Sequence, residues 1–186
     1  MAESTPENQE VLGKKVEDKA LDGRYDDLSL KLDGLIGKFD LDDPEARKDL
    51  LKHLDRMVES DSDLFVEIAS SDLCSPDLLD VFARLSGPIS IKRLVAANIN
   101  TPDYILGSFV YNDDVPVRMN LAANLNTPID TLALLTYDED DGVKAKVAGN
   151  INTPSELLYA LSKSGNPLIS DVASNTLDSK FEDSWG

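Results

Sequence analysis

Cysteine and histidine are almost absent from this chain of 186 residues, which contains one of each. The lone Cys74 excludes an intramolecular disulfide and a thiolate cluster, and with the lone His53 it cannot complete a zinc site within one chain. No motif for cradling phosphates or activating a nucleophile occurs either. We therefore expect no cofactor and no enzymatic activity. We interpret His53 as a surface helix residue and Cys74 as a tolerated turn substitution.

Basic and aromatic residues are also scarce. Lys and Arg number 18 against 35 Asp and Glu, the net charge is −17, and aromatic residues make up 6% of the chain. The acid excess is spread evenly, at −8 over residues 1–63 and −9 over residues 64–186. Such a charge repels phosphate backbones and anionic lipids, so we expect neither direct nucleic-acid binding nor a membrane partner. The charge then serves solubility or attracts a basic protein.

Long apolar runs are missing as well, and no stretch approaches the length of a membrane span. The first residues include Glu3, Glu7 and Glu10 in place of the apolar centre of a secretory signal. We therefore expect a cytoplasmic location. Residues 1–24 are polar and charged, which predicts a flexible acidic arm.

What the chain does contain is a repeat of 26 residues. Four prolines recur at this interval, and Pro76 begins the series. The three following copies share the sequence Asn-x-Asn-Thr-Pro. The repeat-defining residues are Asn98, Thr101, Pro102, Asn124, Thr127, Pro128, Asn150, Thr153 and Pro154.

Apolar residues keep the same register and predict one buried helical face in each unit. In each unit the Thr is suited to accept from an orphan amide as a helix N-cap, with Pro at the first helical position. Thr153 and Glu156 have the spacing of a capping box. The first Asn is suited to end the preceding helix in the left-handed conformation. The expected buried columns are Phe65, Ile91, Val117 and Val143, and then Val95, Leu121 and Val147.

The pattern therefore predicts that each unit consists of a short helix, an Asn-rich turn and a second short helix. Since neither helix is stable alone, we predict an all-α fold in which about four to five two-helix repeats stack into an α-solenoid over residues 63–176. Residues 168–175 form a degenerate fifth copy that runs one residue short. Residues 177–186 form a tail.

Residues 25–62 precede the repeats and carry two apolar stripes. The second stripe follows Asp43 and Pro44, a cap and first-turn pair. We predict N-terminal helices that cap the first repeat, although a partner-binding helix is an alternative. The stripes are Leu28, Leu32, Leu35, Ile36 and Phe39, and then Leu50, Leu51, Leu54 and Met57.

The segments V-R-M-N-L-A-A-N-L-N-T-P and V-K-A-K-V-A-G-N-I-N-T-P resemble the leucine-rich repeat variant family, over about residues 64–175. The resemblance implies HEAT-like units that pair an α-helix with a second, often 3₁₀, helix in a right-handed superhelix. It also implies a generic interaction surface. The cysteine cluster that binds iron–sulfur in some relatives is absent. The usual proline between the two asparagines is replaced by Ile99, Leu125 and Ile151.

The charged residues of the repeats allow several interpretations. The four acids at 138–141 suggest a Ca²⁺ loop but lack the spacing of an EF-hand. We favour turns in which Asp140 caps the next helix and pairs with Lys144, as Asp114 does with Arg118. Lys92, Arg118 and Lys144 form one basic column, a candidate for anion binding that acidic neighbours oppose.

Two functions remain open, and neither is catalytic. The first is a protein-binding module, acting as scaffold, adaptor or inhibitor through one solenoid face. The second is a nucleic-acid mimic that occupies a DNA- or RNA-binding protein, as a phage or bacterial counter-defence factor does. Trp185 either folds back onto the last repeat or forms a linear motif. The candidate partner-binding residues are Asp113, Asp114, Asp138, Glu139, Asp140, Asp141 and Trp185.

Overall fold

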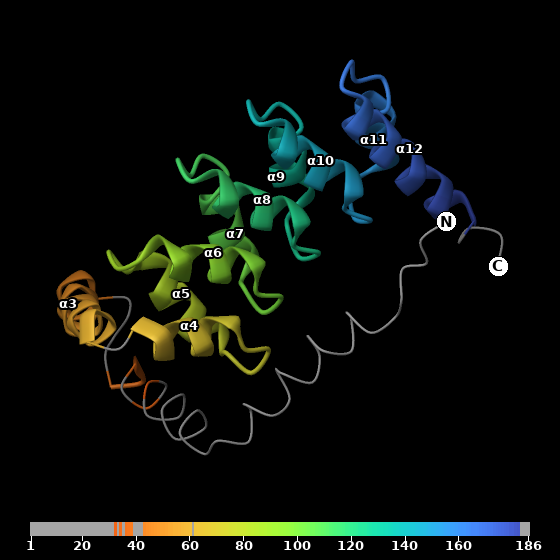
Figure 1. The fold of residues 1–186 in the computed structure, drawn as a ribbon. Helices are drawn as coiled ribbons and strands as arrows, with labels where there is room; N and C mark the ends of the chain where they lie inside the picture. Colours follow the sequence, from red (N-terminus) through yellow and green to blue (C-terminus); the bar gives the residue numbers. More distant parts are fainter. Residues whose placement is uncertain (1–31, 33, 35, 39–42, 61, 183–186) are drawn as a thin grey trace, which may run out of the picture.

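The computed structural model describes residues 32, 34, 36–38, 43–60 and 62–182, and within these ranges all regular structure is helical (Figure 1). The predicted all-α class is therefore confirmed. The helices are α3 (Pro44–Ser60), α4 (Ser62–Ser70), α5 (Pro76–Arg84), α6 (Ile89–Ala97), α7 (Asp103–Ser108), α8 (Val115–Ala123), α9 (Ile129–Leu135), α10 (Asp141–Gly149), α11 (Ser155–Leu161) and α12 (Pro167–Glu182).

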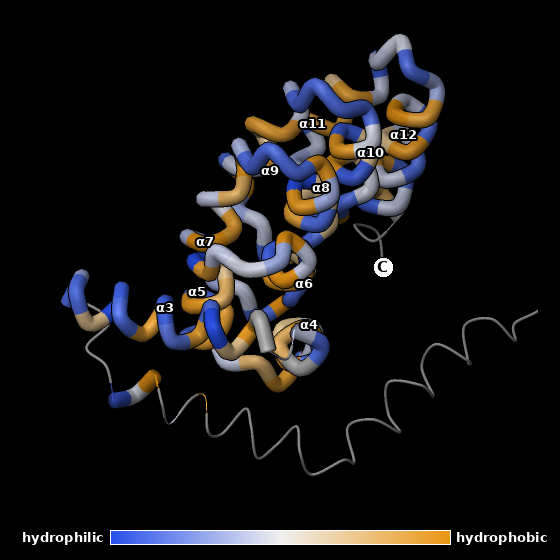
Figure 2. The backbone as a smooth tube through the Cα atoms, turned by 60° about the vertical axis from the view of Figure 1, so that its left-hand side comes forward, coloured by the Kyte–Doolittle hydropathy of each residue, from blue (hydrophilic) through white to orange (hydrophobic). Residues whose placement is uncertain are grey.

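The helices lie in two layers along the molecule. In one layer α4, α6, α8, α10 and α12 follow one another, and each packs against the next. The shorter helices α7, α9 and α11 lie on the other side, and orange segments occur along both layers of the tube in Figure 2. Neighbouring 26-residue units therefore contact one another in sequence order.

Burial follows the predicted register. The column that begins with Phe65 is buried in four units and the column that begins with Val95 in three, and the second helices bury their apolar residues in the same way. Neither helix of a unit is long enough to be stable alone, since isolated helices shorter than about 12 residues are marginal in water. Packing between units therefore supplies most of the stability. The buried second-helix residues are Ile105, Leu106, Phe109, Leu132, Leu135, Leu158 and Leu161.

The first Asn of each turn ties one unit to the previous one. The side-chain amide of Asn124 donates to the carbonyl oxygens of Ala96 and Asn98, at 3.0 and 2.9 Å, and its Oδ1 accepts from the amide of Asn126 at 2.9 Å. Asn150 makes the equivalent contacts, and Asn98 donates to Ala69 and Ser71, each one residue earlier in the previous unit. A buried ladder of asparagine amides therefore satisfies backbone carbonyls that would otherwise lack a partner.

The prediction that these asparagines adopt the left-handed conformation is wrong. Asn98 ends α6 with φ −69° and ψ 128°, and no described residue, glycine included, has a positive φ. Asn124 and Asn150 leave their helices in the same extended conformation. In each case the side-chain amide bonds to the previous unit and Oδ1 accepts from the amide of the second Asn of the turn.

The threonines do not cap the second helices. Thr101, Thr127 and Thr153 are buried, and each hydroxyl donates back to a carbonyl of the preceding helix, as Thr127 does to Leu121 at 2.6 Å. No side chain caps α7, α9 or α11, so the predicted capping box at Thr153 is also wrong. In the earliest unit the prediction holds, because Ser75 accepts from the amide of Leu78 and Pro76 begins α5.

At the N-terminal side, α3 contacts α4 and buries Leu50 and Leu54. The predicted Asp43 cap is present, since its carboxylate accepts from the amide of Glu45 at 3.1 Å. Leu32 and Ile36 are buried. The arm at 1–24, Leu28, Leu35, Phe39 and Trp185 lie outside the described residues, and the division of the chain into four segments stays a prediction.

Cys74 lies in the turn between α4 and α5, as predicted, and its side chain is buried in the core. One further prediction needs correction. The fifth copy keeps the 26-residue register instead of running one residue short, because Ile169 and Ala173 are the buried residues and Leu168 is exposed. Helix α12 continues past Asn175 to Glu182, since no Asn stands at the position that ends the other helices.

Candidate functional site

Two turns, residues 109–114 between α7 and α8 and residues 136–140 between α9 and α10, hold all but one of the acids that the sequence singled out, and we call them the acidic edge. Each turn is closed by a side chain. Asn112 accepts from the amide of Asp114 at 3.0 Å, and Asp138 accepts from the amide of Asp140 at 2.9 Å. Asp114 and Asp140 then accept from an amide in the first turn of α8 and α10, at 3.0 and 3.1 Å. The predicted capping by Asp140 is confirmed.

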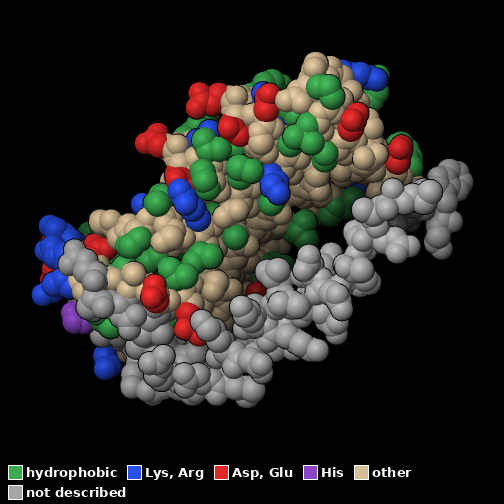
Figure 3. Space-filling view, viewed as in Figure 1, with side chains coloured by type: hydrophobic (Ala, Val, Ile, Leu, Met, Phe, Trp, Pro, Cys, Tyr) green, Lys and Arg blue, Asp and Glu red, His purple; other side chains and the backbone are tan. Residues whose placement is uncertain are grey.

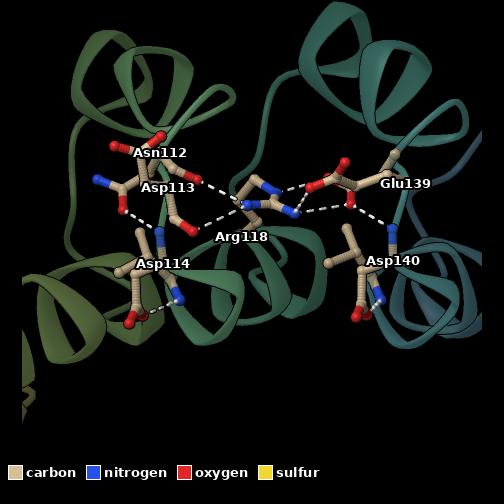
Figure 4. A network of polar contacts seen from close by, with 9 residues as sticks. Asn112, Asp113, Asp114, Arg118, Glu139 and Asp140 are labelled. Carbon is tan, nitrogen blue, oxygen red and sulfur yellow. Dashed lines mark hydrogen bonds and ion pairs between the residues drawn. The ribbon is translucent and has the colours of Figure 1, made fainter.

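Arg118 of α8 connects the two turns (Figure 4). Its Nε and Nη2 donate to the carboxylate of Asp138 at 2.7 and 3.0 Å, and its Nη1 donates to the carbonyl of Asn112 at 2.7 Å. The Arg118 and Asp138 side chains are only 7% and 6% exposed. This bidentate, buried contact fixes the position of one turn relative to the other.

Protonation of the Asp138 carboxyl depends on two opposing effects. Burial raises its pKa, but hydrogen bonds from the Arg118 guanidinium and from the amide of Asp140 outweigh burial, so the pKa lies below its ordinary value. The pKa of Asp114 is also lowered, chiefly by hydrogen bonds from the guanidinium of Arg93. Both carboxylates are therefore held in the charged form by partners within the chain.

Two predicted ion pairs have different partners. Asp114 pairs with Arg93 at 2.7 Å, whereas Arg118 reaches forward to the next unit. Lys144 pairs with Asp141 at 2.5 Å rather than with Asp140. Since Arg118 and Lys144 both have acidic partners, the basic column does not present a row of available cations for an anion.

The acidic edge exposes two tyrosines that the sequence reasoning missed. Tyr111 and Tyr137 are 79% and 88% exposed. Each lies two residues before an exposed acid, Asp113 or Glu139, and the Glu139 side chain is 91% exposed. In Figure 3 acidic side chains gather along this upper edge of the molecule. The sequence could have revealed them, because the two tyrosines recur at the 26-residue interval of the repeat.

The opposite edge carries a second row of exposed apolar side chains. The residue between the two asparagines of each turn is 49% exposed at both Ile99 and Leu125. The equivalent residues Leu73 and Ile151 are exposed as well. We call this row the aliphatic edge. At Ile99, Leu125 and Ile151 the apolar residue stands between two asparagines, which distinguishes this row from the tyrosine and acid positions of the acidic edge.

No group of three or more His, Cys, Asp or Glu within the described ranges is arranged to hold a metal ion, so the calcium interpretation of residues 138–141 gains no support. No helix in the described part of the chain is both long and apolar enough to span a membrane. A hollow of about 300 Å³ lies where α3 meets the turn after α5, and its Lys48, Lys52 and Arg84 pair with acids of their own helices.

Comparisons with family models, with curated proteins and with solved structures found no match to this chain. The resemblance to the leucine-rich repeat variant family therefore rests on the repeat motif alone.

Proposed function

We propose that the chain is a non-enzymatic, protein-binding repeat module that acts as a scaffold, adaptor or inhibitor. In this proposal its 26-residue units form a right-handed α-solenoid of the leucine-rich repeat variant type. Two features support the arrangement: the row of helices in which each packs on the next, and the asparagine contacts that link successive units. A stack of this kind presents the same surface position once per unit, which suits recognition of an extended partner.

The observation that carries the function is the exposure of Tyr111 and Tyr137 on the acidic edge. Tyrosine is enriched at interfaces because it supplies a large contact area at a low cost in conformational entropy. Two tyrosines at the same position of successive units, each almost fully exposed, contribute little to the core. Their placement favours a partner that contacts both units at once.

The nucleic-acid mimic is supported less well by the geometry. Imitating a phosphate backbone requires a series of available carboxylates. On the acidic edge Asp114 and Asp138 are paired with basic residues and Asp140 caps α10, and the neighbouring Asp141 pairs with Lys144. The exposed acids of these turns are Asp113 and Glu139, and one Glu139 oxygen lies 3.9 Å from the Arg118 guanidinium, which leaves few carboxylates for mimicry.

Affinity capture from a lysate of the source organism tests the proposal. The bait is the intact chain, compared with a Tyr111→Ala/Tyr137→Ala variant and with an Ile99→Ser/Leu125→Ser variant of the aliphatic edge as a matched control. All four positions are exposed, so both variants should keep the wild-type melting temperature. Captures are performed at low and moderate salt, and the bound proteins are identified by mass spectrometry.

The proposal expects a protein that the wild type and the aliphatic-edge variant retain and the tyrosine variant loses. Equal capture by all three baits would show that the tyrosines of the acidic edge are not part of the binding surface. Recovery of a nucleic-acid-binding protein that is released steeply by salt would instead support mimicry.

A further inference from the structure

In the turns between α7 and α8 and between α9 and α10, an exposed tyrosine precedes an exposed acid by two residues, so this turn pattern occurs in two successive units. Tyr111 and Asp113 form the first pair, and Tyr137 and Glu139 form the second. In the preceding unit the equivalent positions hold Leu85, which is buried, and Gly87; in the following unit they hold Lys163 and Gly165. The repeated surface therefore spans two units and ends at both sides.

The chemistry of each pair suits a cationic side chain. The face of a tyrosine ring attracts an ammonium or guanidinium group, and a neighbouring carboxylate adds a charged partner. The chain itself contains such a contact, because the Lys163 ammonium lies 4.9 Å from the centre of the Tyr159 ring. The charge of −17 further favours a basic ligand.

The spacing of the two pairs restricts the conformation of that ligand. Packed helices lie about 8–10 Å apart, so successive units repeat at roughly that distance. A polyproline II segment advances about 9 Å per turn of three residues and returns its side chains to the same side. In an extended strand, side chains on one side recur at about 7 Å or 13 Å, which fits the units poorly.

The two turns are held in place before any ligand binds. Arg118 contacts the carbonyl of Asn112 in one turn and the carboxylate of Asp138 in the other, and it is buried. Such preorganisation reduces the entropy lost on binding. The distance between the two tyrosine–acid pairs is therefore set by the fold.

From these observations we infer that the acidic edge binds a segment in the polyproline II conformation that carries Arg or Lys at every third position. One cation contacts Tyr111 and Asp113, and the next contacts Tyr137 and Glu139. The inference rests on the proposed protein-binding function and adds the chemistry and the conformation of the partner segment. Lys163 repels a third cation and so fixes the register of the segment.

Fluorescence anisotropy with two labelled peptides tests the inference on the intact chain. The first peptide repeats the triplet Arg-Pro-Pro. The second has the same composition, with arginines alternately two and four positions apart and never three. We expect the wild type to bind the triplet peptide about tenfold more tightly, because only that peptide places two cations on the two pairs together.

Variants assign the binding to the named residues. Tyr111→Ala/Tyr137→Ala should weaken binding of the triplet peptide about tenfold, and Asp113→Asn/Glu139→Gln should weaken binding and reduce its dependence on salt. The matched control Ile99→Ser/Leu125→Ser should keep the wild-type affinity.

Equal affinity for the two peptides, no binding of either, or full affinity in the tyrosine variant would overturn the inference. The proposed function is judged separately by the lysate capture. A partner that depends on the tyrosines while the triplet peptide fails to bind would leave the proposed function standing and reject only the polyproline II ligand.

Discussion

Arg118 and Asp138 form a bidentate ion pair between successive units, with Nε–Oδ2 and Nη2–Oδ1 distances of 2.7 and 3.0 Å. Asp138 lies 20 residues after Arg118, so the pair joins α8 to the turn that precedes α10. Because the same guanidinium also reaches the carbonyl of Asn112, one buried side chain holds both turns of the acidic edge.

Replacing Arg118 with methionine should lower the free energy of unfolding by about 3 kcal/mol, because it leaves the Asp138 carboxylate buried without its partner. The matched control is Arg93→Met, which removes the half-exposed partner of Asp114 and should cost clearly less than Arg118→Met. Urea denaturation of the three proteins measures both values. Equal losses would contradict a special role for the buried pair.

The contribution of Asp138 should depend on pH. Its folded-state pKa is lowered from an unfolded value of about 3.9, so the stabilisation is complete above that value and is lost as pH falls through the folded pKa. Asp138→Asn should therefore be less stable than the wild type at neutral pH, and the difference should shrink below about pH 4. Unfolding in urea across this range measures the difference.

Thr127→Val is a suitable control for that pH series, because it removes a hydroxyl group that does not ionise in this pH range. The difference between Thr127→Val and the wild type should stay constant with pH. A difference for Asp138→Asn that is equally constant would contradict the role assigned to the carboxylate.

The asparagine ladder should make the first Asn of each turn more important than the second. Asn124→Ala leaves the buried carbonyls of Ala96 and Asn98 without donors and should cost about 3 kcal/mol. Asn126 is exposed, and losing its contact with the Ile99 carbonyl should cost about 1 kcal/mol or less. Similar losses in the free energy of unfolding for Asn124→Ala and Asn126→Ala, measured by urea denaturation, would show that the asparagine ladder adds little stability.

The role of the motif threonine can be tested by substitutions that separate a side chain able to donate a hydrogen bond from one that can only accept it. Thr127 donates to the Leu121 carbonyl from a buried position. Thr127→Asp should lose about 3 kcal/mol, because a buried carboxylate faces a carbonyl oxygen. Thr127→Ser keeps the donor and should lose about 1 kcal/mol. If the threonine were an N-cap, Asp would be tolerated at least as well as Thr, and thermal melts distinguish the two cases.

The sequence was sufficient to predict those features that depend on local periodicity. Val117 and Leu121 repeat at the helical interval and at the 26-residue interval together, so their burial could be predicted. Capping by Asp140 depends on neighbours a few residues away and was predicted correctly.

The features that were missed depend on contacts that the local pattern does not contain. Thr101 looks like an N-cap of the following helix, but its hydroxyl donates to the Val95 carbonyl of the preceding helix in the same unit. Asn98 looks like a left-handed helix end, but its side chain is used by the previous unit. Asp114 lies near Arg118 in sequence and pairs instead with Arg93 of the unit before. Contacts between units decide the cases of Asn98 and Asp114, and one unit read alone does not contain them.

The central claim is that the acidic edge is the surface that meets a protein partner. The most direct measurement is photo-crosslinking in lysate with a benzophenone amino acid in place of Tyr137, compared with the same amino acid in place of Leu125 on the aliphatic edge. The account predicts a discrete crosslinked protein from position 137 and none from position 125. A partner that crosslinks from position 125 and not from position 137 would contradict it.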